Sequence, residues 1–385
     1  MTTTTAARKV MSVFDDRRAG ELLRELLAAA GVTIGGDAPW DIQVHDDRVY
    51  ARVLRDGTLG FGEAYVDGWW DTPALDQLVD RVIRARLDEA VRESWVLIAH
   101  AVRARLFNRQ VSRAFEIAER HYDIGNDLYE AMLDRRMVYT CGYWQDATDL
   151  EAAQEAKLEL VCRKIGLAPG MRVLDLGCGW GGFAAFAAER HGAEVVGYTV
   201  SKEQVRWAKE HYPGLPIDIR LADYRTATGT YDAVVSIGLM EHVGPKNHRG
   251  YMELARRCLA PGGVAFIHTI GAIRSRTHIE PWFAKYIFPN AVIPSLAQLT
   301  SAMEGSFTVE DVHNIGPHYD PTLMAWWQRF DAAWPRLRPR YGDAFYRMWK
   351  FYLLASAGAV RSRLQQLFQI VATPFGGAQP PCRQR

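Results

Sequence analysis

A carboxylate and a histidine stand side by side in the segment "IGLMEHVGPKNH", which begins at Ile237. The residues just before it, "YDAVVS", form an apolar run that predicts a buried strand. Glu241 and His242 therefore follow a strand end, where they form either a solvated turn or a pair capable of acid–base chemistry. A metal site is disfavoured, because no companion ligands stand at the spacing of a helix or a hairpin.

A glycine-rich segment upstream favours a catalytic interpretation. In "VLDLGCGWGG", Gly177, Gly179 and Gly181 let the backbone turn tightly and approach a ligand, and Asp175 precedes the first of them by two residues. A nicotinamide cofactor is the obvious competitor, but its fingerprint is G-x-G-x-x-G. The order here is G-x-G-x-G-G, with the acid inside the strand. With "GVAFIHTIG" further along, it resembles the class I S-adenosylmethionine-dependent methyltransferases.

This resemblance implies a set of cofactor contacts at neighbouring strand ends. In many such enzymes an acid at the end of the second strand accepts the ribose hydroxyls. Here "GYTVS" supplies Thr199 and then Ser201, whose neutral hydroxyls are weaker partners and could equally be turn residues. "LADY" offers Asp223 for the adenine amino group. The other residues implied to contact the cofactor are Tyr139, Thr140, Gln204 and Tyr224.

The elements that must position these residues alternate between strand and helix. The expected strands are "MRVLDLG", "AEVVGYTV", "YDAVVSIG" and "GGVAFIHTI", with helical patterns between them. We predict an α/β, doubly wound, mostly parallel Rossmann-like methyltransferase sheet, with Glu241 and His268 at the carboxyl ends of its strands. A smaller, mainly helical N-terminal domain is expected over residues 1–120, and the catalytic domain over 121–385. "ELLRELLAAAG" predicts a short helix that ends at Gly31.

Composition limits the partners and the compartment. The 385 residues carry 46 Lys and Arg against 45 Asp and Glu, so a formal net charge of +1 argues against nucleic acid as a partner. Five scattered cysteines without a C-x-x-C pair argue against disulfides and zinc. The N-terminus lacks a secretory pattern, and no apolar run approaches the roughly 20 residues that span a bilayer. We therefore expect a cytoplasmic protein that is soluble or lies on a membrane surface.

Longer stretches narrow the resemblance. They are "FGEAYVDGWW", "HYDIGNDLYEAMLD", "YTCGYW", "VLDLGCGWGG", "MEHVGPKNH", "FIHTIG", "KYIFPN", "HYDPTLMAWW" and "RSRLQQLFQ". From about residue 15 to 371 the chain resembles the cyclopropane-fatty-acyl-phospholipid synthases. The resemblance implies that S-adenosylmethionine methylates the cis double bond of an acyl chain in an intact phospholipid. A proton then leaves the new methyl group and a cyclopropane ring closes, with a bound bicarbonate ion as the implied base.

The family's bicarbonate pocket maps onto this sequence residue by residue. "YTCGYW" supplies Cys141, "MEHVG" supplies Glu241, "HTIG" supplies His268 and Ile270, and "HYDPT" supplies Tyr319. Histidine, tyrosine and backbone N–H groups can donate to a small oxyanion, and a carboxylate can orient a donor or accept the bicarbonate hydroxyl. We therefore expect these five residues to carry the chemistry, without a covalent nucleophile.

Two further residues receive structural interpretations. His242 follows Glu241 directly, so we expect its side chain to point away from the site. Ser356, in "YLLASAGAVRSR", stands where relatives often carry cysteine. We interpret it as a packing residue, because a hydroxyl and a thiol are similar in size.

The segment 81–113 is the candidate for membrane docking. Nine Arg and no Lys fall between Arg81 and His121, interleaved with apolar residues. Cationic helices with an apolar face bind anionic lipid surfaces, although an ordinary solvated helix face gives the same pattern. The resemblance further implies a homodimer that associates peripherally with the inner face of the membrane and acts on unsaturated phospholipids.

Three rival functions remain open. A small-molecule N- or O-methyltransferase would explain the sheet and the glycine loop but not "HYDIGNDLY" or "HYDPTL". A lipid-binding protein with an inactive cofactor site would not need a complete set of pocket residues. A related fatty-acyl methyltransferase that leaves a methyl branch or a methylene is the hardest to separate, because ring closure depends on where the base lies.

Overall fold

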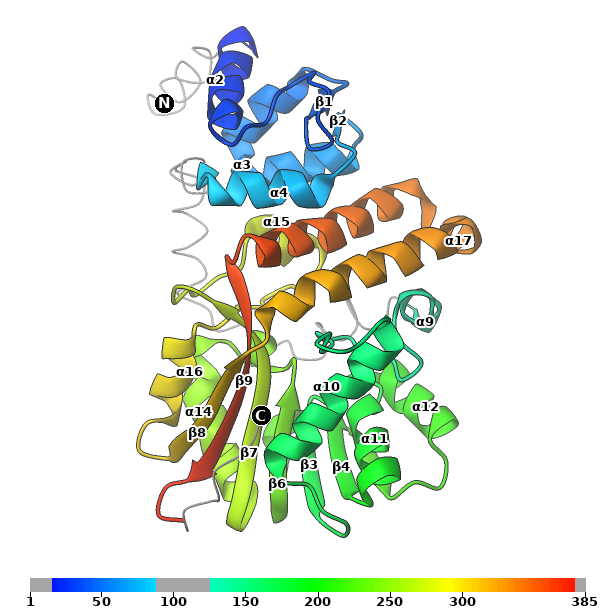
Figure 1. Ribbon diagram of the computed structural model, residues 1–385, viewed down its shortest axis with the longest axis vertical. Coiled ribbons are helices and arrows are strands. Elements are labelled where there is room, and N and C mark those ends of the chain that lie inside the picture. Colours follow the sequence, from blue (N-terminus) through cyan, green and yellow to red (C-terminus); the bar gives the residue numbers. More distant parts are fainter. Residues whose placement is uncertain (1–15, 88–124, 378–385) are drawn as a thin grey trace, which may run out of the picture.

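The computed structural model describes residues 16–87 and 125–377, which form a sheet flanked by helices and a helical N-terminal unit above it (Figure 1). The strands are β1 (Gln43–Val44), β2 (Trp70–Asp71), β3 (Arg172–Leu176), β4 (Glu194–Thr199), β5 (Ile217–Leu221), β6 (Tyr231–Ile237), β7 (Leu259–Ala272), β8 (Phe307–Asn314) and β9 (Gln365–Pro374). The helices are α2 (Asp16–Ala29), α3 (Arg48–Val66), α4 (Leu75–Arg84), α9 (Asn126–Met132), α10 (Leu150–Ile165), α11 (Gly182–His191), α12 (Lys202–His211), α13 (Met240–Val243), α14 (His248–Cys258), α15 (Pro281–Tyr286), α16 (Leu296–Met303) and α17 (Tyr319–Arg361), with 3-10 turns η2 (Tyr224–Thr226), η3 (Pro245–Asn247) and η4 (Gly316–His318).

The main sheet has seven strands in the order β5-β4-β3-β6-β7-β9-β8. Strands β3 to β7 pair in parallel, whereas β9 is antiparallel to both of its neighbours. The four strands expected from the sequence are β3, β4, β6 and β7, so the predicted doubly wound, mostly parallel fold is confirmed. Their apolar runs are buried because helices cover both faces of the sheet (Figure 1).

The register of the sheet brings the expected site residues together. Ile237, the last residue of β6, pairs with His268 on β7. The chain then turns through Gly238 into α13, so Glu241 lies just beyond His268 at the carboxyl edge of the sheet. The loop after β3 enters α11 at the same edge. This edge is where parallel sheets of this kind bind ligands.

The antiparallel strands and α17 were not expected from the sequence. Helix α17 is interrupted at Gly342, whose φ of 76° and ψ of 163° are not helical, and it carries Pro335 and Pro339 just before the break. Figure 1 shows its two arms running back side by side between the N-terminal unit and the sheet. Phe330 of the first arm stacks on Tyr346 of the second with ring centroids 5.8 Å apart.

The described part of the N-terminal unit, residues 16–87, is mainly helical and packs directly on α17. A Cβ added at Gly358 would lie 2.5 Å from the Asp76 carbonyl oxygen, so the backbones of α4 and α17 are in close contact. Arg361 bridges Asp76 and Asp320, and Arg347 pairs with Asp71. The expected domain boundary near residue 120 and most of the 81–113 segment lie outside the described residues.

Candidate active site

Two cavities meet at the carboxyl edge of the sheet and share a wall. The first, of about 170 Å³, lies over the ends of β3 and β4, and we call it the sheet-edge cavity. The second, of about 270 Å³, lies between the sheet, α17 and α4, and we call it the apolar cavity. Tyr139, Thr140, Gly238 and His242 line both cavities and so form the wall between them. A group that reaches past this wall can react with a molecule held on the other side.

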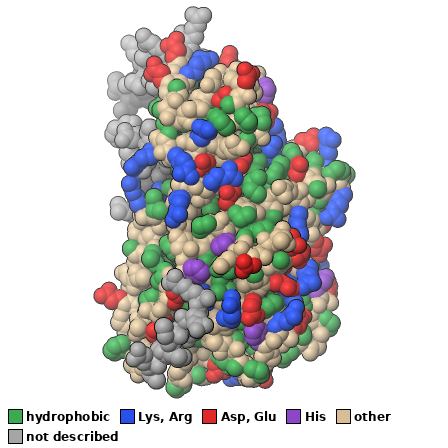
Figure 2. Space-filling model, viewed as in Figure 1, with side chains coloured by type: hydrophobic (Ala, Val, Ile, Leu, Met, Phe, Trp, Pro, Cys, Tyr) green, Lys and Arg blue, Asp and Glu red, His purple; other side chains and the backbone are tan. Residues whose placement is uncertain are grey.

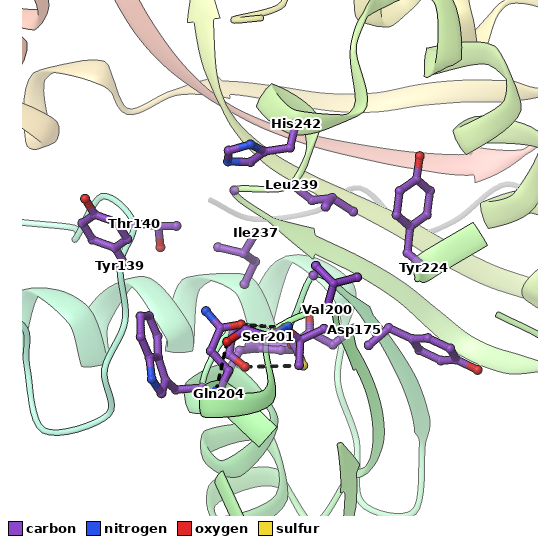
Figure 3. Close-up of a pocket in the computed structure, with 18 of the residues that line it drawn as sticks. Tyr139, Thr140, Asp175, Val200, Ser201, Gln204, Tyr224, Ile237, Leu239 and His242 are labelled. Atoms are coloured by element: carbon purple, nitrogen blue, oxygen red, sulfur yellow. Dashed lines mark hydrogen bonds between the residues drawn. The ribbon is translucent and has the colours of Figure 1, made fainter. Parts of the chain in front are cut away.

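The sheet-edge cavity gathers almost every residue expected to contact the cofactor (Figure 3). Gly179 has a φ of 56° and no atom within 4 Å of the place where a side chain would begin, so its backbone faces open cavity. Gly181 alone among the expected residues does not line it, since this glycine is the N-cap of α11. The expected residues that do line it are Tyr139, Thr140, Asp175, Gly177, Gly179, Thr199, Ser201, Gln204, Asp223 and Tyr224.

At the end of β4, hydroxyl and amide groups stand where many relatives of this fold have an acid. Thr199 Oγ1 donates to Gln204 Oε1 at 2.5 Å and accepts a hydrogen bond from the Ser201 N–H at 3.2 Å. The Ser201 hydroxyl caps α12 by accepting from the Gln204 N–H at 3.3 Å. The Thr199 proton is therefore already used within the protein. The amide of Gln204 also lines the cavity and can contact a ligand there.

Asp223 has a partner inside the protein. Its carboxylate accepts from the Arg225 backbone N–H at 2.9 Å and from Arg225 Nε at 2.7 Å, and this pairing helps to lower its pKa despite partial burial. Both residues line the sheet-edge cavity. The carboxylate is thus fixed at the cavity edge by Arg225.

Lys157 lines the same cavity and was missed by the sequence reasoning. Its side chain is fully buried on α10, and burial lowers its pKa to about 8. Asp175 is also buried; burial raises its pKa to about 7, and the charge of Lys157 opposes that rise. The helical spacing of α10 marks residue 157 as buried but gives no sign that its neighbours would be an acid and a cavity.

The apolar cavity has walls of hydrocarbon from opposite ends of the chain. α3 and α4 contribute one side and the second arm of α17 the other, with α15 and the segment before it closing the space. The apolar lining residues from these elements are Phe61, Leu78, Val79, Val82, Ile83, Ile279, Phe283, Phe351, Tyr352, Ala355 and Ala359. Such a lining excludes water and suits an extended hydrocarbon chain.

All five residues expected to carry the chemistry line this apolar cavity: Cys141, Glu241, His268, Ile270 and Tyr319. Glu241 Oε1 accepts a hydrogen bond of 2.6 Å from the Ile270 N–H, and Oε2 accepts none from the described residues within hydrogen-bonding distance. Burial raises the pKa of Glu241 to about 7, and the Ile270 hydrogen bond opposes this only in part. The Ile270 N–H, expected to hold an anion, here orients Glu241 instead.

His268 lines the apolar cavity with a buried ring. The Gln369 amide lies 3.3 Å from Nδ1, and Nε2 has no hydrogen-bond partner among the described residues. Burial lowers the pKa of His268 well below its usual value, so the ring is neutral. If the Gln369 NH₂ donates to Nδ1, the ring proton is on Nε2 and is available to an acceptor.

The expectation that His242 points away from the site is wrong. Its ring lines both cavities, and Figure 3 shows it on the Leu239 side of the sheet-edge cavity, above Ile237. It belongs to the four-residue α13, where one residue of separation rotates a side chain by about 100° rather than to the opposite face of a strand. Burial lowers its pKa to about 4, so His242 is a neutral imidazole.

The described residues, 16–87 and 125–377, contain neither a metal-binding cluster nor a membrane-spanning helix. In those ranges no three His, Cys, Asp or Glu side chains are grouped so as to hold a metal ion. Within the same ranges, no helix combines the length and the hydropathy needed to cross a bilayer.

Comparisons with known proteins identify the relatives of this chain. The family model of mycolic acid cyclopropane synthetase matches residues 109–370. The chain is 47% identical to the cyclopropane-fatty-acyl-phospholipid synthase of Escherichia coli K12, over 91% of this chain and 92% of that protein. It is 32% identical to the tuberculostearic acid methyltransferase UfaA1 of Mycobacterium tuberculosis, over 92% and 88%. The cyclopropane synthase MmaA2 from M. tuberculosis superposes with a TM-score of 0.63 at 28% identity, covering 67% of this chain and 97% of that one. The chain therefore belongs to the cyclopropane-fatty-acyl-phospholipid synthase family of S-adenosylmethionine-dependent methyltransferases.

Proposed function

We propose that this protein adds a methylene group, taken from the methyl of S-adenosylmethionine, across the cis double bond of an unsaturated phospholipid acyl chain. The observation that carries the proposal is the shared wall. A cavity with the residues for S-adenosylmethionine adjoins a longer apolar cavity across Tyr139 and Thr140. An alkene is a weak nucleophile, so its alignment with the sulfonium methyl is the main catalytic requirement.

The reaction balances as two steps. The π electrons of the alkene attack the methyl carbon, and the carbon–sulfur bond breaks towards sulfur, which leaves S-adenosylhomocysteine and a carbocation on the chain. A base then takes a proton from the new methyl group, and the electrons of that C–H bond close the ring. Tyr139 and Tyr352, whose hydroxyls lie 2.7 Å apart, line the apolar cavity, where aromatic faces can stabilise the cation.

For the base, we propose a bicarbonate ion held by Cys141, Glu241, His268 and Tyr319, with Ile270 holding Glu241 in place. The neutral His268 offers Nε2–H, and Glu241 offers an oxygen with no partner among the described residues to the bicarbonate hydroxyl. Burial raises the pKa of the Cys141 thiol, so this residue contributes a weak donor rather than a thiolate. Depleting carbon dioxide from the buffer should depress turnover, and added bicarbonate should restore it. An unchanged rate would transfer the role of base to Glu241.

We propose further that the substrate is a phospholipid taken from an anionic membrane. The name of the E. coli relative specifies a phospholipid. Figure 2 shows Lys and Arg side chains gathered where the N-terminal unit meets the catalytic domain. Two arginines at the start of the 81–113 segment have partners in the protein. Arg81 stacks over Trp40 at 3.5 Å, and Arg84 pairs with Asp80. The homodimer stays a prediction from the resemblance.

A second candidate, transfer of a methyl group without ring closure, is favoured by one observation. UfaA1 is named as a methyltransferase, and its match covers 92% of this chain. The two reactions share the methyl transfer and differ in the fate of the carbocation. A base in the apolar cavity favours the ring.

Lipid analysis tests the proposal. The protein is expressed in cells that contain unsaturated phospholipids, and the acyl chains are examined by gas chromatography and mass spectrometry. Cyclopropane chains absent from the vector control are the expected result. Methyl-branched chains would establish the second candidate, and unaltered chains with active protein present would overturn both.

A further inference from the structure

Lys157 is fully enclosed in the protein and has no part in the reaction described above. It lies on α10 one turn after Gln154, which is also fully buried. Both side chains point to the same short stretch of chain. Gln154 Nε2 donates to the Thr140 carbonyl oxygen at 2.7 Å, and Lys157 Nζ donates to Thr140 Oγ1 at 2.9 Å. α10 therefore holds Thr140 by both its backbone and its side chain.

Thr140 is the residue for which such control matters. It lines both cavities and is flanked by Tyr139 and Cys141. Its methyl group lies against Gly238, because a Cβ added at that glycine would be 2.8 Å from Thr140 Cγ2. Gly238 opens the turn that leads to Glu241. A shift of Thr140 would consequently move the wall between the cavities and press on the turn that positions Glu241.

Several other titratable groups surround Lys157. The charged and titratable groups that face it are Asp134 from the loop after α9, Cys141 next to Thr140, Asp175 on β3 and His268 on β7. Of these, Asp175 is buried, with one oxygen unpaired among the described residues. A buried ammonium is costly unless it is partnered. Here the partner is the Thr140 hydroxyl, with the neighbouring acids opposing the loss of charge.

We infer that Lys157 is a positioning residue: by its hydrogen bond to the Thr140 hydroxyl it fixes the wall across which the methyl group passes. This inference rests on the proposed reaction. It assigns Lys157 an effect on the rate of methyl transfer, where misplacement of about 1 Å can cost about 10²-fold. Thr140 and Lys157 also line the sheet-edge cavity, so the readout that tests this inference is kcat at saturating S-adenosylmethionine rather than cofactor affinity.

Three variants test the link between Lys157 and Thr140. Lys157→Met and Thr140→Val should each lower kcat on phospholipid vesicles by about tenfold to 10²-fold. Thr140→Ser, which keeps the hydroxyl, should restore most of the rate. The double variant should be no slower than the slower single variant, since both remove one interaction. All rates are compared at saturating S-adenosylmethionine, so that any change in cofactor affinity does not enter kcat.

Lys164→Met is the matched control. Lys164 is also buried on α10, but its ion pair is with Asp311 on β8, at 2.6 Å, and it lines neither cavity. This change should lower the melting temperature and leave kcat unaltered. The pH profile adds a second readout. Wild-type kcat should fall as pH rises through the pKa of Lys157, about 8, because the neutral amine is a weaker donor to Thr140, and Lys157→Met should lack that alkaline fall.

The results separate this inference from the proposed function. If wild-type protein converts no lipid, the proposed function fails. If it does convert lipid and Lys157→Met is equally fast, or if the Lys157 and Thr140 effects multiply in the double variant, Lys157 is not a positioning residue. A Lys157→Met protein that does not fold leaves Thr140→Val and Thr140→Ser to decide.

Discussion

The sheet-edge cavity and the apolar cavity share a wall but are assembled in opposite ways. The first is built from consecutive strand ends and the loops that come after them, so residues within one stretch of about 50 positions supply most of it. The second combines α3 and α4 from the start of the chain with α17 near its end. Binding of a small, water-soluble cofactor is thus a local property of the sheet, whereas binding of an acyl chain depends on the N-terminal unit staying docked on α17.

The polar contacts of the two regions show the same division. Around the sheet-edge cavity, hydrogen bonds such as those from Thr199 to Gln204 and from Arg225 to Asp223 join residues close in sequence. Around the apolar cavity, they join distant elements. The Thr58 hydroxyl donates to Glu280 at 2.5 Å, and Glu63 accepts from Lys285 and from Tyr286. Changes in one region should accordingly leave the other intact, and single substitutions on each side of the wall test that independence.

The largest effect is expected for Glu241→Gln. The amide keeps the shape of the side chain but loses the carboxylate, so activity should fall by about 10² to 10⁴-fold, the usual contribution of general-base catalysis. Affinity for S-adenosylhomocysteine, measured by calorimetry, should not change, because Glu241 lines only the apolar cavity. A parallel loss of cofactor affinity would show that the two cavities are not independent.

The same substitution should stabilise the protein in alkaline solution. In the folded protein the pKa of Glu241 is raised from 4.5 to about 7, so the fold favours the protonated acid. Stability is therefore lost as pH rises from the unfolded pKa to the folded one, and the loss is complete above it. Without bicarbonate, Glu241→Gln should exceed wild type by up to about 3 kcal/mol at high pH and match it under acid conditions. Equal denaturant midpoints at all pH values would show that Glu241 ionises without penalty.

Gly179→Val should weaken cofactor binding by an order of magnitude or more. Gly179 has a positive φ and faces open cavity, so a branched side chain both strains the loop and fills the space needed by the ligand. The control is Gly262→Val, since Gly262 has a φ of 79° and likewise no atom within 4 Å, but does not line either cavity. If both variants bound S-adenosylhomocysteine equally well, the glycine loop would not be the cofactor site.

The smallest effects on lipid turnover are expected at Ser356, where two substitutions can be compared. It lines the apolar cavity on the second arm of α17. Ser356→Trp should fill that cavity and slow lipid turnover by roughly tenfold while cofactor affinity stays constant. Ser356→Cys restores the residue that relatives often carry and should leave turnover within about twofold of wild type, because sulfur and oxygen differ little in volume. A rate gain in the Cys variant would show that this position does more than pack.

The same contrast between local and distant contacts decides which parts of the site could be predicted from the sequence. The glycine loop, Asp175, Thr199 and Gln204 lie on adjacent strand ends, and strand order alone puts them at one edge. Cys141, Glu241, His268 and Tyr319 were brought together only by resemblance, since nothing local relates Cys141 to Tyr319. Their meeting depends on the return of α17 over the sheet.

Three features were predicted wrongly or not at all, and the reasons are physical. His242 was assigned to the wrong side because the segment after β6 was treated as extended, whereas α13 turns both neighbours towards the cavities. Lys157 was overlooked because a lysine on a helix is usually exposed, and nothing in the sequence indicates its hydrogen bond to Thr140. The helical hairpin of α17 was not predicted; the helix continues through Pro335 and Pro339, is interrupted at Gly342 and then resumes.

The position of β9 has a consequence for how the protein is made. β9 lies between β7 and β8, yet it comes after both in the chain. During synthesis β8 leaves the ribosome with no strand to pair with, and it must wait until α17 and then β9 have emerged. Gln369, the partner of His268, arrives on that same strand. The cofactor side of the sheet can thus assemble on the nascent chain, while the histidine of the apolar cavity acquires its Gln369 partner only when nearly all of the described chain has been translated.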